Sequence, residues 1–163
     1  MSFVGAAAKN AVLALPPARR AWKRRLLGGG LSGEPPAAAR RIFDLHAGAA
    51  GAVRPLADAD VLEIGPGGNL RVLELFRAAG ARRAAAIDVA PWAGDGVAQT
   101  SPDPTQAVEY LVPVTVENLP FQDESFDVIY SHTCFQYVAN PKAAVAEIAR
   151  VLRAGGVTSH LID

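Results

Sequence analysis

A short run near the middle of the chain, Val61 to Asn69, constrains the fold more than any other feature. Val61 to Ile64 has the pattern of a buried strand that carries one acid, Glu63, and it opens directly into Gly65-Pro66-Gly67-Gly68. Glycines in such a turn let the backbone pass close to a ligand, because they lack a Cβ atom and accept positive φ. A carboxylate two residues before the first glycine disfavours a pyrophosphate ligand and favours a cationic or amine-bearing one.

The residues after Asp60 alternate between strand and helix patterns. The expected elements are strands at 61–64, 84–87, 110–114, 126–131 and 157–162, and helices at 69–79 and 141–152. Pro113 indicates that strand 110–114 lies at an edge of the sheet, and Gly155-Gly156 is expected to stop the second helix. This alternation predicts an α/β fold, a Rossmann-like doubly wound parallel sheet with right-handed crossovers.

The first part of the chain has a different character. Residues 1–58 are expected to form a helical segment, with one or two short helices within 1–33 and another at 37–50, and residues 59–163 to form the core. No acid precedes Glu34, whereas six basic residues do. This pattern fits a solvated helix face, or an arm that touches an anionic partner or a membrane surface. His46 lies in the helix at 37–50, where we expect a packed or surface histidine and not a ligand.

Composition excludes several classes of function. The formal net charge of +0 argues against nucleic-acid binding through bulk charge. The only cysteine, Cys134, excludes an intrachain disulfide and a multi-thiolate metal site, so no metal is expected. No apolar run approaches the roughly 20 residues of a membrane span. We therefore expect a cytoplasmic protein without a secretory signal.

Parallel sheets of this kind bind ligands at the carboxyl ends of their strands. Asp88 ends the strand at 84–87, one β-α-β unit after Gly65, and its carboxylate is placed to accept hydrogen bonds from ribose hydroxyls. The alternative is an ordinary turn residue at a strand end. An NAD site is the competing hypothesis, but Leu70 stands where the fingerprint requires its last glycine, and Glu63 would face the pyrophosphate.

Five motifs follow one another in an order that carries a resemblance. They are Glu63-x-Gly65-x-Gly67, Asp88, Glu117 to Phe121, Ser125 to Ile129 and Glu147 to Gly156. Together they resemble the class I S-adenosylmethionine-dependent methyltransferases, and most of all the small-molecule, type 11-like group. The resemblance covers about residues 59–163 and implies a sheet with strand order 3-2-1-4-5.

The resemblance also implies a set of cofactor contacts. Glu63 is expected near the methionine amino group, the glycine turn against the methionine and ribose, and Asp88 on the ribose hydroxyls. Val116, Glu117 and Asn118 are expected at the adenine edge, and Ser131 and His132 on the sulfonium side. The implied cofactor-binding residues are Glu63, Gly65, Pro66, Gly67, Gly68, Asn69, Asp88, Val89, Val116, Glu117, Asn118, Ser131 and His132.

Three departures from the family pattern stand out. Asn69 replaces a frequent glycine, and Thr115 stands where an aspartate often holds adenine. Members usually continue into a sixth and a seventh strand that help to shape the substrate pocket, whereas this chain ends at Asp163, directly after the expected fifth strand.

The resemblance implies S-adenosylmethionine-dependent methyl transfer to a small-molecule acceptor that the sequence does not identify. A general base is needed only if the acceptor carries a proton, and His132 is the candidate, with a pocket-wall residue as the alternative. The alternative function is a non-catalytic or partner-dependent cofactor-binding module that pairs with itself or with a partner chain at the edge of the fifth strand. An NAD-dependent oxidoreductase is disfavoured by Glu63 and Leu70.

Overall fold

A computed structural model describes residues 36–90 and 107–162 of the chain. The helices expected within 1–33, the basic stretch before Glu34 and most of the loop expected at 89–105 lie outside these residues. The described elements are α3 (Pro36–Gly51), β1 (Asp60–Ile64), α4 (Arg71–Ala78), β2 (Arg83–Ile87), β3 (Glu109–Leu111), β4 (Phe126–His132), the 3₁₀ helix η2 (Phe135–Tyr137), α5 (Pro141–Val151) and β5 (Leu152–Leu161).

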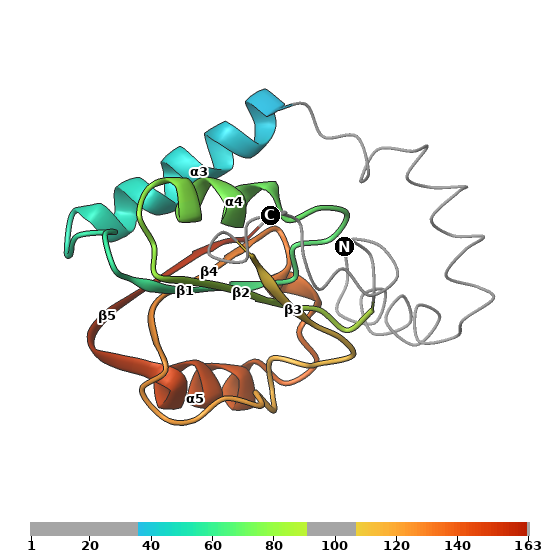
Figure 1. The fold of residues 1–163 in the computed structure, drawn as a ribbon. Helices are drawn as coiled ribbons and strands as arrows, with labels where there is room; N and C mark the ends of the chain where they lie inside the picture. The colour runs from blue at the N-terminus through green and yellow to red at the C-terminus, as the bar shows by residue number, and fades with distance from the viewer. Residues whose placement is uncertain (1–35, 91–106, 163) are drawn as a thin grey trace, which may run out of the picture.

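The five strands form one parallel sheet in the order β3-β2-β1-β4-β5. This order confirms the predicted doubly wound fold. The edge position predicted for strand 110–114 is also confirmed, but β3 ends at Leu111, so Pro113 lies beyond the strand. Helices α3 and α4 cover one face of the sheet and α5 covers the other (Figure 1). Glu63 of β1 therefore lies between Ala86 of β2 and Tyr130 of β4 in the middle of the sheet.

Each face of the sheet has its own apolar core. On the α3 and α4 face, Phe43 and Phe76 pack edge to face with ring centroids 5.0 Å apart, and Tyr130 packs below Phe76. On the other face, Ile148 of α5 packs with Ile129 and Phe126. All of β1 and nearly all of β4 are buried, as expected for central strands covered on both faces.

The first helix of the core begins later than predicted. Asn69 lies before α4, where its side-chain Oδ1 accepts a hydrogen bond from the Arg71 N–H at 3.1 Å, and Leu70 has the non-helical φ of −110°. The asparagine therefore ends the turn and does not start the helix, because its side chain competes for a backbone donor.

The last helix and strand meet differently from the prediction. Pro141 stands in the first turn of α5 as expected, after Asn140, whose side chain accepts a hydrogen bond from the Ala143 N–H. The helix ends at Val151 and passes directly into β5, so Gly155-Gly156 lies within the strand and does not stop the helix. Phe126 and Val128, two positions apart on β4, pair with Leu152 and Val157, five positions apart on β5. Gly155, with its positive φ, lies within this irregularity.

An ion-pair cluster closes the amino ends of the two central strands. Asp127 accepts a hydrogen bond from the Asp60 N–H at 2.8 Å, and Arg153 bridges both carboxylates at 2.7 and 2.8 Å. Arg54 pairs with Asp127 and Arg82 with Asp60. Both carboxylates are buried, so each needs these cations to offset the loss of water.

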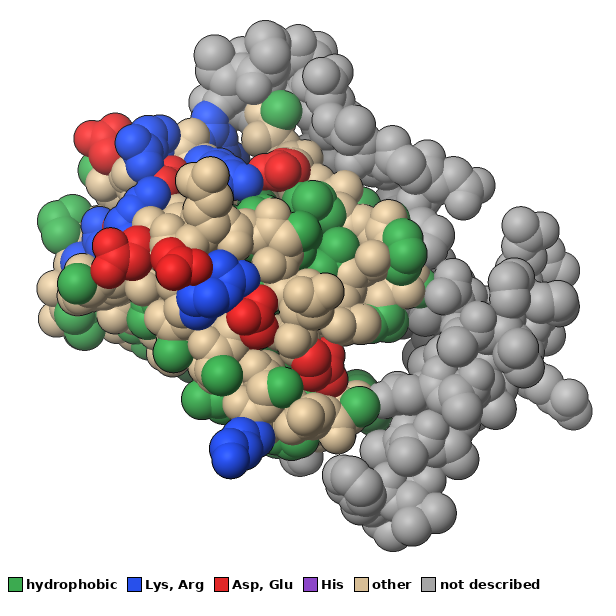
Figure 2. All heavy atoms as spheres, turned by 90° about the horizontal axis from the view of Figure 1, so that it is seen from below, with side chains coloured by type: hydrophobic (Ala, Val, Ile, Leu, Met, Phe, Trp, Pro, Cys, Tyr) green, Lys and Arg blue, Asp and Glu red, His purple; other side chains and the backbone are tan. Residues whose placement is uncertain are grey.

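The described surface shows no segregation of charge on the side that carries α5. Acidic and basic side chains are interspersed there among apolar and polar ones (Figure 2). None of the helices within the described ranges combines the length and the apolar character that a membrane crossing requires.

Candidate functional site

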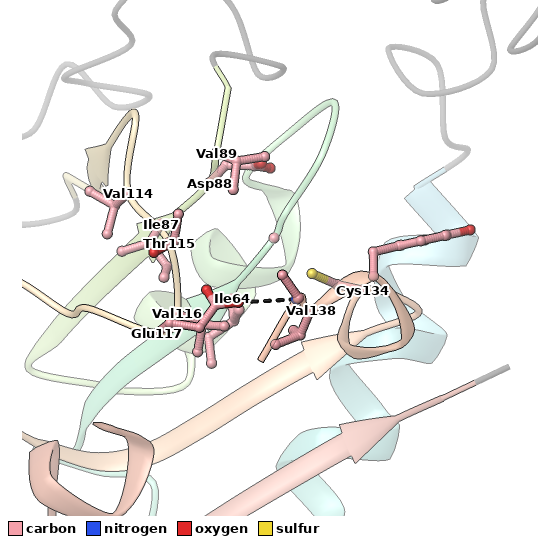
Figure 3. A pocket seen from close by; sticks show the side chains of 13 residues that line it. Ile64, Ile87, Asp88, Val89, Val114, Thr115, Val116, Glu117, Cys134 and Val138 are labelled. Carbon is pink, nitrogen blue, oxygen red and sulfur yellow. Dashed lines mark hydrogen bonds between the residues drawn. The ribbon is translucent and has the colours of Figure 1, made fainter. Parts of the chain in front are cut away.

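A cavity of about 380 Å³ opens at the carboxyl ends of β1 and β2, a size suited to a small molecule. Figure 3 shows Asp88 and Val89 on one side of it and Cys134 and Val138 on the other. Its walls are Ile64, Gly65, Ile87, Asp88, Val89, Val114, Thr115, Val116, Glu117, Cys134, Tyr137, Val138 and Ala139. The walls are therefore mainly apolar, with two carboxylates among them.

The glycine turn is shaped by its contact with the segment after β4. Gly65 has a φ of 72°, and a Cβ atom there would lie 2.3 Å from the Sγ atom of Cys134. Gly67 has a similar φ of 69°, but a Cβ atom there would meet nothing within 4 Å. Both glycines are therefore needed for the left-handed backbone, and Gly65 is needed also for space.

Asp88 directly follows β2 at the cavity, where hydrogen bonds fix both its side chain and its backbone. Its Oδ2 accepts a hydrogen bond from the Gly67 N–H at 3.3 Å, so the acid and the glycine turn are joined directly. Its backbone N–H donates to the Leu111 carbonyl and its carbonyl accepts from Val114. Asp88 and Gly67 are 21 residues apart in the sequence, and the pairing of β1 with β2 brings the buried carboxylate beside the turn.

Three carboxylates make this end of the sheet electronegative. Burial is the main cause that raises the pKa of the Cys134 thiol to about 12, and the carboxylates of Asp88, Glu63 and Glu117 raise it further. Cys134 is consequently a neutral thiol. The same three charges favour a positively charged ligand beside it.

Glu63 lies behind the cavity and does not line it. The side chain is buried at the carboxyl end of β1, next to Tyr130 on β4. Burial and the Glu63 carboxylate raise the pKa of Tyr130 well above its ordinary value, so the phenol stays neutral. Glu63 therefore connects the cavity side of the sheet with the residues that pack under α3.

Glu117 has a structural partner that the sequence did not indicate. Its Oε1 accepts hydrogen bonds from the backbone N–H groups of Ala139 and Asn140, at 3.1 and 3.2 Å. The carboxylate thereby ties the segment after β3 to the start of α5. Asn118, predicted beside it at the adenine edge, is exposed and lies outside the cavity lining.

The turn after Glu117 has a structural role. Leu119 is buried, and Phe121 packs edge to face on Phe126 at 4.7 Å. Arg150 of α5 donates to the carbonyls of Leu119 and Phe121 at 3.0 and 2.8 Å. Hydrogen bonds from Arg150 and from the Leu119 N–H lower the pKa of Glu147 to about 2.

The structure divides the sequence-predicted site residues into two groups. Five of them line the cavity, namely Gly65, Asp88, Val89, Val116 and Glu117. Pro66, Gly67, Gly68 and Asn69 continue the turn beyond the lining, whereas Ser131 and His132 lie apart from it and face other histidines.

The cavity also has walls that the sequence prediction did not include. They are Ile64, Ile87, Val114, Thr115, Cys134, Tyr137, Val138 and Ala139. The first two are the last residues of β1 and β2, a position that could have identified them. The last three follow β4 through η2, and only the fold brings this segment back over the cavity.

His46 is packed, one of the two alternatives expected, but the sequence did not indicate its polar partners. It is fully buried, with its Nδ1 2.8 Å from the Ser159 Oγ and its Nε2 3.4 Å from the His132 Nδ1. His160 of β5 contacts the Ser131 Oγ at 2.8 Å through its Nδ1. His132 and Ser159 therefore form a polar cluster with His46 under α3. Ser131 and His160, the alternate residues of the same two strands, face the other side of the sheet. The same residues form no cluster of three metal-ligating side chains within the described part of the chain.

Comparisons with known proteins agree with this architecture. Over residues 62–159, well over half of the chain, the sequence matches the profile of the family described as Methyltransferase domain. The chain belongs to the class I S-adenosylmethionine-dependent methyltransferase family. The resemblance that the motifs carry is thereby confirmed.

Solved structures share the fold of this chain at low sequence identity. One is the protein bound to the Trm112 methyltransferase activator of Haloferax volcanii, with a TM-score of 0.56 and 24% identity over 78% of this chain and 55% of that one. Another is an S-adenosylmethionine-dependent methyltransferase from Mesorhizobium loti, with a TM-score of 0.56 and 18% identity over 80% and 54% of the two chains. The cyclase SpnF has a TM-score of 0.57 and 22% identity over 76% and 44%. A cyclase with this fold shows that the fold alone does not specify the reaction.

The chain spans about half the length of these solved structures. A shorter match, 45% identical over 40 residues, joins it to an uncharacterized protein of Methanocaldococcus jannaschii and covers 24% of this chain and 20% of that protein.

Proposed function

We propose that the chain binds S-adenosylmethionine in the cavity beside Gly65 and directs its methyl group to a small-molecule acceptor. The observation that carries this proposal is the combination of an apolar cavity with the carboxylates of Asp88, Glu63 and Glu117, all close enough to raise the pKa of Cys134. The apolar walls suit a flat base, and the carboxylates suit hydroxyls, an amine and a positive sulfur. The residues present therefore fit this cofactor better than they fit a dinucleotide.

Each of these residues has a proposed task. Asp88 accepts hydrogen bonds from the ribose hydroxyls. Its carboxylate has about four acceptor sites, and the Gly67 N–H uses only one of them. Val89 and Val116 pack on the base. Glu63 attracts the amino group of the methionine portion, and Gly65 to Asn69 pass their backbone along it.

The bound cofactor supplies a methyl group on an electron-deficient sulfur. The task left to the protein is to align the acceptor with that methyl group and to exclude water, and orientation of this kind contributes about 7–11 kcal/mol. We place the acceptor on the side of His132, under the segment 1–58, which we propose as a cap. This placement is supported by His46 of α3, which contacts His132 directly.

Calorimetry with S-adenosylhomocysteine tests the proposal, because this product lacks the reactive methyl group and needs no acceptor. We expect one binding site with micromolar affinity, and no binding of NADH under the same conditions. Absence of heat at millimolar S-adenosylhomocysteine would reject the cofactor assignment, and tight NADH binding would revive the dinucleotide alternative.

A partner-dependent module is the second candidate. Strand β5 has ten residues and pairs on one side only with β4 among the described strands, so its other edge offers free backbone groups to a second chain. Light scattering at several protein concentrations distinguishes the two. A monomer that turns over cofactor argues against the module, whereas a stable dimer without turnover supports it.

A further inference from the structure

Two of the three histidines of the chain, His46 and His132, meet on the α3 side of the sheet, although 86 residues separate them in the sequence. His160 lies on the other face, where it bonds Ser131 and packs against Phe135. His46 comes from α3, His132 from the end of β4 and His160 from β5. The ring of His46 lies 4.8 Å from that of Tyr130 and nearly perpendicular to that of His132 at 5.6 Å. Tyr130 in turn packs on Phe76 at 5.2 Å, so His46 rests on a fixed aromatic support.

Both ring nitrogens of His46 are occupied. Nδ1 faces the Ser159 hydroxyl and Nε2 faces the His132 Nδ1. Burial, followed by the charges of His132 and His160, lowers the pKa of His46 to about 4, so its ring is neutral near pH 7. A neutral imidazole has one N–H and one lone pair, so His46 donates one of these hydrogen bonds and accepts the other.

The role of His132 indicates which hydrogen-bond arrangement of His46 is compatible with proton transfer: the one in which His46 accepts from His132 or the one in which His46 donates to His132. The side chain of His132 is only partly buried, and within the described residues no group hydrogen-bonds its Nε2. When His132 is protonated, both of its nitrogens carry hydrogen, so its Nδ1–H donates and His46 accepts at Nε2. His46 then donates from Nδ1 to Ser159, whose hydroxyl can accept. The same arrangement, kept when His132 is neutral, leaves a lone pair on its Nε2.

We propose that His46 is a positioning residue that holds the neutral His132 in its Nδ1–H form, so that Nε2 accepts a proton from the methyl acceptor. The inference rests on the proposed function and adds a substrate class, an acceptor whose nucleophilic atom carries a proton, such as a hydroxyl oxygen. The proton would leave that oxygen for Nε2 of His132, which would become an imidazolium. The oxygen would keep the electron pair with which it bonds the methyl carbon, while the carbon–sulfur bond would break and its electron pair would pass to the sulfur. The 3.4 Å contact between the two rings is long, as such contacts often are before ligands bind.

The ring-nitrogen chemical shifts of His132, measured by NMR without cofactor or acceptor, test this assignment. With three histidines in the chain, His132→Gln identifies the signal of His132 by its loss. We expect the neutral His132 of the unaltered protein in the Nδ1–H form. A neutral His132 in the Nε2–H form would overturn the proposal, and this measurement requires no other variant to fold.

Three variants separate positioning from packing. His46→Phe fills the space without an acceptor, and we expect His132 to change to the Nε2–H form. His46→Gln offers its Oε1 near the place of Nε2, and we expect it to restore the Nδ1–H form. The control His160→Gln alters the histidine bonded to Ser131 and is expected to leave His132 unchanged. The same tautomer in His46→Phe as in the unaltered protein would overturn the proposal.

Calorimetry with S-adenosylhomocysteine on the same samples keeps the two hypotheses distinct. Unchanged binding together with a wrong tautomer removes the role of His46 and leaves the cofactor assignment intact. A correct tautomer without cofactor binding retains the hydrogen-bond geometry but overturns its place in methyl transfer.

Discussion

Asp88 joins the sheet to the proposed ribose site through a single carboxylate. Asp88→Ala removes the acceptor for the ribose hydroxyls and for the Gly67 N–H. We expect the affinity for S-adenosylhomocysteine to fall by at least about tenfold, which corresponds to about 1.4 kcal/mol. Calorimetry measures this loss, and Asp44→Ala, which alters an exposed acid of α3, is the matched control. Equal affinities for the two variants would show that Asp88 does not contact the ligand.

Gly65 and Gly67 form a natural pair for separating backbone strain from a steric clash. Their φ values are 72° and 69°, but only at Gly65 would a Cβ atom meet the Cys134 Sγ. Gly67→Ala is expected to lower the free energy of unfolding by about 1 kcal/mol, the cost of a left-handed alanine. Gly65→Ala is expected to cost about 2–5 kcal/mol, since overpacking is added. Urea denaturation of both variants tests the difference, and equal losses would contradict the clash.

The packing of β1 and β4 depends on buried charge at their amino ends. Asp127→Ala leaves the Asp60 N–H without its 2.8 Å acceptor and removes a partner of Arg54 and Arg153. We expect a loss of about 2–4 kcal/mol, because buried polar groups lose their partners. Asp44→Ala breaks only an exposed pair with Arg40 and is expected to cost less than about 0.5 kcal/mol. Thermal unfolding of the two variants compares these losses, and similar changes would contradict a structural role for the cluster.

The burial of His46 makes the stability of the whole chain depend on pH. The unfolded chain binds a proton at this site below its ordinary pKa of 6.5, whereas burial and the charges of His132 and His160 hold the folded pKa at about 4. More protons are bound when unfolded, so stability is complete above about pH 6.5 and is lost as the pH falls toward 4. The groups that contact His46 are Tyr130 and His132 on β4 and Ser159 on β5, and the charge of His160 acts on it without contact.

Between about pH 7.5 and 5 this site should account for about 2 kcal/mol of lost stability. Urea denaturation at the two values measures the total change, and His46→Gln removes the part that belongs to His46. The variant is therefore expected to show the smaller pH dependence, because carboxylates contribute equally to both proteins. Identical pH dependence in both would mean that His46 is protonated as easily in the folded state as in the unfolded one.

Local patterns were sufficient for the elements and their order. The strand ending in Glu63 and the glycine turn, the acid at Asp88 and Pro141 before an apolar helix each carry their signal within a few residues. The errors lie at the boundaries. Asn69 was placed in a helix that begins at Arg71, and Gly155-Gly156 was interpreted as a stop although it lies within β5. The ends of these helices depend on which backbone N–H and carbonyl groups are hydrogen-bonded by other residues, and a short stretch of sequence does not contain that information.

The parallel α/β class, the glycine turn and the position of Asp88 followed from the sequence, because alternation and turn chemistry are local properties of the chain. The strand order followed from the family resemblance. Three other features came only from the tertiary structure: the contact of Gly65 with Cys134, the hydrogen bonds from Ala139 and Asn140 to Glu117, and the histidine cluster. The clearest case is His46, which looked like a solitary histidine because its partners are 86 and 113 residues away. Such pairs form only when α3 packs over β4 and β5, and long-range packing alone brings their ring nitrogens and hydroxyls within reach.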